Sequence, residues 1–141
     1  MRNRANELPI QVVVIAPPDG LDQPWIDGLG SERGIEVLAR VAVLKRGIEA
    51  VEQLQPNVLV IDRDVEEIED TLHEIYPIAP NTLCVAVQPS QDMAAIRRLI
   101  AAGARDVVAK PLQAKELAAS MRQVVQMDAA RRERAGLPPP G

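Results

Sequence analysis

The chain has 141 residues, 47% of them apolar and 26% charged, and a formal net charge of −4. These values predict a single globular domain, and the acidic balance argues against a nucleic-acid-binding surface. A lone cysteine, Cys84, excludes an internal disulfide, and no apolar run is long enough for a signal peptide or a membrane span, so we expect a cytoplasmic protein.

The first part of the chain alternates strand and helix patterns. Residues 10–15 are a β-branched run that stops at Pro17, which predicts a strand followed by a sharp loop. A helix is expected over residues 22–33, where apolar residues recur at every fourth position, although two glycines weaken it. Residues 35–43 then predict a second strand whose partial alternation suits a sheet edge, and residues 45–55 a second helix.

The middle of the chain repeats this alternation. Residues 57–61 carry no polar side chain after the asparagine, which predicts a central strand buried on both faces. A third helix is expected over residues 66–76, closed by prolines, and a fourth strand over residues 82–87. The fourth helix, residues 93–102, is preceded by a capping aspartate and followed by a glycine, and residues 106–109 form the fifth strand.

The last helix is expected to begin near Gln113 and to lose its apolar face at Asp128. The closing prolines exclude a helix at the C-terminus, and the arginines just before them are expected to be solvated. We therefore expect a disordered N-terminal extension over residues 1–8, a folded domain over residues 9–130, and a linker or tail over residues 131–141.

Five strands alternating with five helices predict an α/β fold, because crossover connections between parallel strands are almost always right-handed. The expected architecture is a three-layer, doubly wound, five-stranded parallel sheet of order 2-1-3-4-5, the flavodoxin-like order. The carboxyl ends of such strands share one edge, where ligands bind. Asp62 ends the third strand and Lys110 follows the fifth, so the two side chains should meet there.

The strand-three aspartate and the segment Gly103-Ala-Arg-Asp-Val-Val-Ala-Lys-Pro111 together resemble the CheY-like receiver domain of two-component response regulators. The resemblance implies that Asp62 stands in the phosphoacceptor position and that Lys110 contacts the phosphoryl group, followed by a cis-proline at Pro111. The chain looks most like the N-terminal receiver-like domain of CpaE/TadZ-family pilus-assembly proteins. In that family a Pro/Ala-rich linker joins the module to a MinD/ParA-like ATPase domain, which implies a possible C-terminal ATPase domain here.

The metal-binding part of the receiver pattern departs from the family. Receivers end the first strand in two adjacent acids that hold Mg²⁺, whereas this strand ends in Ala16 and Pro17. One aspartate, Asp62, holds Mg²⁺ weakly. Asp19 and Asp64 lie two residues beyond Pro17 and Asp62, so they are possible further ligands. We therefore expect no cofactor, with a weakly held Mg²⁺ as the alternative at this edge.

The signalling part of the pattern departs as well. Gln88 stands where receivers have a Ser or Thr that contacts the phosphoryl oxygen, and Val107 replaces the aromatic switch residue. Lys110 is then either part of a phosphorylation site or simply an ion-pair partner of Asp62. His73 lies within a predicted helix and is expected to be a solvated surface residue.

Three functions remain open. The first is a non-catalytic receiver-like interaction module of a signalling or Flp-type pilus-assembly and localisation protein. The second is a phosphorylatable receiver that uses Asp62 with Mg²⁺ in a two-component phosphorelay, and the third is a nucleotide- or cofactor-binding flavodoxin-like domain. A protein partner or a homodimer is expected to bind the face made by the fourth helix, fifth strand and fifth helix. Six alanines lie on this face, and their small side chains either allow another helix to approach closely or only pack against the sheet: Ala94, Ala95, Ala101, Ala102, Ala118 and Ala119.

Overall fold

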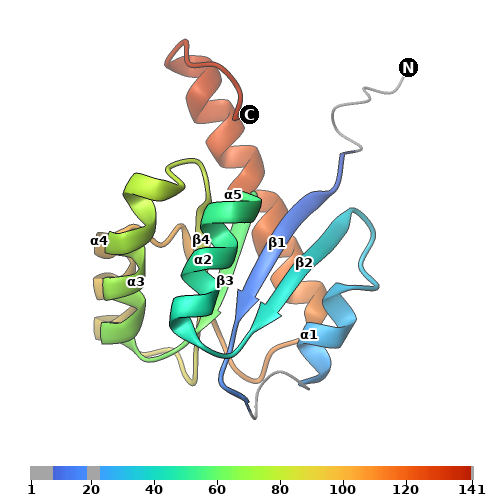
Figure 1. Ribbon diagram of the computed structural model, residues 1–141, viewed down its shortest axis with the longest axis vertical. Coiled ribbons are helices and arrows are strands. Elements are labelled where there is room, and N and C mark those ends of the chain that lie inside the picture. Colours follow the sequence, from blue (N-terminus) through green and yellow to red (C-terminus); the bar gives the residue numbers. More distant parts are fainter. Residues whose placement is uncertain (1–7, 19–22, 141) are drawn as a thin grey trace.

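The computed structural model describes residues 8–18 and 23–140 (Figure 1). The expected N-terminal extension up to residue 7, and Asp19, lie outside the described residues. Ten elements lie within the described ranges: β1 (Ile10–Ile15), α1 (Pro24–Leu29), β2 (Ile35–Val41), α2 (Leu44–Leu54), β3 (Val58–Asp62), α3 (Val65–Ile78), β4 (Leu83–Gln88), α4 (Met93–Ala102), β5 (Asp106–Ala109) and α5 (Ala114–Arg134).

The strands form one sheet in the order β2-β1-β3-β4-β5, and every neighbouring pair is parallel. The predicted doubly wound architecture is confirmed. β3 lies at the centre and all of its residues are buried, whereas the more polar β2 lies at an edge. Both positions follow from the side chains, because a strand covered on both faces has to be apolar along the covered length, as β3 is up to its last residue, Asp62.

Helices cover both faces of the sheet: α1 and α5 lie on one side, and α2, α3 and α4 on the other (Figure 1). Successive strand residues point to opposite faces, so β1 contributes to two separate cores. Val12 and Val14 pack with Trp25 on the α1/α5 side, while Val13 and Ile15 join the core beneath the other three helices.

The ends of α1 and α3 differ from the sequence prediction. α1 ends at Leu29, so the expected continuation to residue 33 is wrong. A Cβ on Gly28 would lie 2.6 Å from the Ala114 Cβ, which means that this glycine serves the close packing of α1 on the start of α5. α3 runs to Ile78 with Pro77 inside it, because a proline in the last turn removes only one helical hydrogen bond.

α5 is longer than predicted and runs to Arg134, past the end of the sheet (Figure 1). Residues 131–134, expected to be linker or tail, are therefore helical. The apolar residues of the buried helix face stop near Asp128. The Asp128 carboxylate is itself buried, so a polar contact holds this part of α5 where an apolar side chain would be expected.

Candidate functional site

The carboxyl edge of the sheet brings Asp62 and Lys110 together as predicted. Asp62 ends β3, and Lys110 follows β5 with its backbone N–H donating to the Gln88 carbonyl at 3.0 Å. The Lys110 Nζ lies 2.8 Å from the Asp62 Oδ2, and the Lys110–Pro111 peptide bond is cis. This part of the edge matches what the resemblance to receivers implies.

The contact between the two side chains is an ion pair. The Asp62 side chain is only 8% exposed and that of Lys110 36%. Oδ2 is buried and makes no hydrogen bond within the described part of the chain, so the ammonium compensates it through charge alone. The Lys110 charge is thus the nearest compensation for a carboxylate removed from water.

Around Asp62, the residues that the structure describes offer few ligands for a divalent cation. Ala16 is fully buried and, like Pro17, offers no side-chain oxygen. The Asp64 carboxylate accepts the Glu67 backbone N–H at 2.8 Å as the N-cap of α3, which commits that oxygen to the helix end. Among residues 8–18 and 23–140, no three His, Cys, Asp or Glu side chains are grouped so as to hold a metal ion.

Gln88 lies at the end of β4 with 4% of its surface exposed. Its Nε2 donates to the Arg63 carbonyl and to the Val87 carbonyl, both at 2.9 Å. A side-chain amide has two N–H donors, so both are committed to the backbone. Neither donor is available in this arrangement for a ligand at Asp62.

Arg63 is a residue of this edge that the sequence reasoning missed. Its guanidinium donates to the Ala42 carbonyl after β2 and lies 3.5 Å from the Glu67 carboxylate, with 18% of the side chain exposed. Arg63 therefore ties the ends of β2 and β3 together. The signal was present, since a charge directly after a buried strand has to lie at the sheet edge.

Val107, which the resemblance to receivers implies for the switch position, is partly buried in β5. Its side chain packs against the core beneath α2, α3 and α4. A valine has no polar tip that would favour a second, exposed rotamer, so this position offers packing only.

A second polar cluster surrounds Asp128 on α5. This carboxylate is 3% exposed and is bound by Arg105 at 3.2 Å, Arg131 at 3.1 Å and Arg132 at 3.0 Å. Arg132, 14% exposed, also donates to the Asn81 Oδ1 at 2.6 Å, so the expectation that these arginines are all solvated is wrong. Burial alone would raise the pKa of Asp128, but hydrogen bonds from Arg132 and Arg131 and the charge of Arg105 outweigh it and hold the pKa below its ordinary value.

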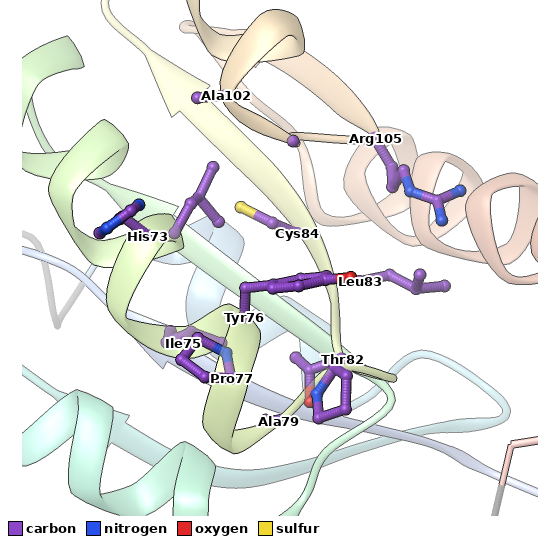
Figure 2. Close-up of a pocket in the computed structure, with 13 residues that line it drawn as sticks. His73, Ile75, Tyr76, Pro77, Ala79, Thr82, Leu83, Cys84, Ala102 and Arg105 are labelled. Atoms are coloured by element: carbon purple, nitrogen blue, oxygen red, sulfur yellow. The ribbon is translucent and has the colours of Figure 1, made fainter.

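An open pocket of about 580 Å³ lies at the amino end of β4, away from Asp62 (Figure 2). Tyr76 reaches from α3 toward Leu83 on β4, and His73 lies exposed at the rim, as expected of a surface residue. Cys84 lines the pocket but is 3% exposed, and burial raises the pKa of its thiol to about 12. The Cys84 thiol is therefore held in its protonated, unreactive form.

Comparison with known proteins supports the fold. The chain is 25% identical to the chemotaxis protein CheY of Thermotoga maritima over 96 residues, 67% of this chain and 80% of that protein. It superposes on the response regulator domain of Thermotoga maritima CheB with a TM-score of 0.69 at 20% identity, covering 82% and 96% of the two chains. The pilus assembly protein CpaE of Caulobacter crescentus gives 0.64 at 18% identity, covering 84% and 93%.

No protein-family model matches the chain. The chain has the CheY-like receiver fold, similar both to response-regulator receivers and to CpaE, as the sequence motifs predicted. Within the described part of the chain, no helix is both long enough and apolar enough to span a membrane.

Proposed function

We propose that this chain is a non-catalytic receiver-like module that binds other proteins, in signalling or in Flp-type pilus assembly and localisation. One observation carries the proposal: Asp62 is paired with Lys110, while positions 16 and 17 carry no acid and the Asp64 carboxylate caps a helix.

Phosphorylation of an aspartate requires a cation that neutralises the charge gathering on the phosphoryl oxygens. Mg²⁺ needs several oxygen ligands in near-octahedral geometry. Asp62 supplies one carboxylate, and its near oxygen already faces an ammonium group. The donors of Gln88 are committed to backbone carbonyls as well. Each of these features lowers the capacity of this edge for phosphoryl transfer.

The experiment is incubation with acetyl phosphate and Mg²⁺, read by intact mass, and with beryllofluoride and Mg²⁺, read by thermal shift. We expect no mass gain and no stabilisation beyond that of Asp62→Asn. A phosphorylatable receiver treated in parallel confirms that the reagents are active. An adduct that forms on the wild type and not on Asp62→Asn would overturn the proposal.

The alternative is a phosphorylatable receiver, and one observation favours it. Lys110 lies 2.8 Å from Asp62 and precedes a cis-proline, which is the arrangement that the resemblance to active receivers implies. The same experiment decides between the two functions, since only the alternative gives an Asp62-dependent adduct.

The partner surface in this proposal is the face of α4, β5 and α5. Met93 and Ile100 on α4 are 60% and 47% exposed, and Met127 on α5 is 62% exposed. Ala118 is fully buried against the sheet, while the five other alanines of this face are at least partly accessible. A protein partner or a second copy on this face, a cytoplasmic location and a joined ATPase domain are parts of the proposal that draw on the likeness to CpaE.

A further inference from the structure

A groove runs between α2 and α3, which lie side by side on one face of the sheet (Figure 1). Its volume is about 580 Å³. Leu44 and Ile48 line it from α2 and are only partly buried, with Thr71 of α3 also lining it. The apolar floor of the groove is therefore left partly open to solvent.

The rim of this groove is acidic. Glu49 of α2 and Glu67, Asp70 and Glu74 of α3 line it, against one cation, Lys45. Glu67 lies 3.5 Å from the Arg63 guanidinium, but the other three carboxylates make no ion pair with any residue of the described ranges.

The acidic stripe on α3 is not explained by the stability of the helix. Asp70 and Glu74 lie one turn apart, and like charges at this spacing destabilise a helix. On the side of α3 that faces α4, by contrast, Glu69 is bound by Arg98 at 2.6 and 3.1 Å. Within the described ranges, the protein thus neutralises an acid beside α4 and leaves Glu49, Asp70 and Glu74 beside the groove without an ion pair.

We propose that this groove docks a basic amphipathic helix of a partner protein. Three acids of α3 recur at one-turn intervals, and a helix presents Lys or Arg side chains with the same repeat beside an apolar stripe. The apolar stripe would cover Leu44 and Ile48 while the cations meet the rim. This surface would be one partner site of the interaction module, so its biological role rests on the proposed function.

Other occupants fit the groove less well. A phosphate-bearing partner, either nucleic acid or a lipid surface, would be repelled by the carboxylates. A second copy that joined groove to groove by two-fold symmetry would place like charges against each other. The charge of the rim therefore favours a cationic segment of another protein.

The test uses the full chain and a fluorescent synthetic peptide of about 18 residues, in which lysines flank a leucine stripe at helical spacing. A peptide of the same composition in scrambled order is the first control. We expect the ordered peptide to bind at least about tenfold more tightly in anisotropy titrations at low salt, and its affinity to fall as salt is added. Equal binding of the two peptides would overturn the proposal, because it would show non-specific charge attraction.

Protein variants locate the binding. Glu49→Lys and Glu74→Lys reverse charges on the rim, and we expect each to weaken binding by about tenfold. Glu133→Lys makes the same change at an exposed position of α5, which lies on the other side of the sheet (Figure 1), and should alter affinity by less than about twofold. Equal losses in Glu49→Lys and Glu133→Lys would assign the effect to net charge and reject the groove.

Two further outcomes would overturn the inference: absence of binding by the wild type, or a self-association of the wild type that Glu74→Lys abolishes. The phosphorylation experiment is independent of both. An Asp62 adduct together with peptide binding would reject the proposed non-catalytic function and keep the groove as a docking site. A peptide that fails to bind would reject only the docking proposal.

Discussion

Replacing Asp128 with asparagine removes the negative charge to which three arginines bind. The carboxylate is 3% exposed, and its partners approach from just before β5, where Arg105 lies, and from the last turns of α5 at 3.0 to 3.2 Å. Asparagine keeps the size but presents an N–H donor where a carboxylate oxygen stood. Asp128→Asn therefore leaves the arginines facing a neutral amide.

The expected loss of stability depends on the burial of the Asp128 carboxylate and on the exposure of its arginine partners. A hydrogen bond to a charged group contributes about 1.5–3 kcal/mol, and breaking a buried pair costs about 3–5 kcal/mol. Arg105 and Arg131 are 37% and 46% exposed, so water recovers part of what they lose. We expect unfolding free energy to fall by about 2–3 kcal/mol, which lowers the Tm by roughly 6–12 °C for a domain of this size.

Urea and thermal unfolding at pH 7 measure this loss, with Glu133→Gln as the matched control. Glu133 is exposed on the same helix and should change stability by less than about 0.5 kcal/mol. A loss in Asp128→Asn no larger than in the control would refute the reasoning that the arginine cluster anchors α5.

The pH dependence has a defined sign. The folded state holds the pKa of Asp128 below its ordinary 3.8, so the stabilisation is complete above that value and is lost as the pH falls through the lower, folded-state pKa. The difference between wild type and Asp128→Asn should be constant from pH 7 to about pH 5 and should narrow in stronger acid. A difference that widens on acidification would contradict the assignment.

Three further predictions concern the core and the helix ends. Asp92→Ala removes the carboxylate that accepts the Ala94 N–H at 3.0 Å, and should cost about 1 kcal/mol in urea unfolding; no loss would reject the cap. Gly47→Ala places a Cβ against the Ile15 Cδ1, closer than van der Waals contact allows, so we expect the unfolding free energy to fall by about 1–3 kcal/mol, and a gain in stability would contradict this packing. The Cys84 thiol, with a pKa of about 12, should react with a disulfide reagent at pH 8 only at the rate of unfolding, and a rapid reaction of the native protein would contradict its burial.

The strands, their order and the meeting of Asp62 with Lys110 could all be predicted from the sequence. Each apolar run can be recognised without its neighbours, because burial on both faces requires β3 and β4 to be apolar up to their last residues, Asp62 and Gln88. The right-handed crossover then leaves few ways to order five such strands. The Asp62–Lys110 contact follows, since the carboxyl ends of parallel strands open on one edge.

The use of each polar group could not be predicted in the same way. Asp64 was a possible metal ligand, but it caps α3, and the amide of Gln88 turns to the Arg63 and Val87 carbonyls. Such choices depend on which donor is nearest in space. The sequence shows which donors and acceptors are present, but it does not show which of them lies nearest to a given side chain in the folded protein.

The amino acid order alone therefore determined the receiver fold and the pair at its carboxyl edge, because hydrophobic periodicity is local. Only the tertiary structure decided where α5 ends and what Asp128 does. Its partner Arg105 lies 23 residues away in sequence, and Arg132 reaches Asn81 across 51 residues. A buried charge is tolerated only when folding brings its counter-charges to it, and the residue pattern of one helix does not predict which distant side chains those are.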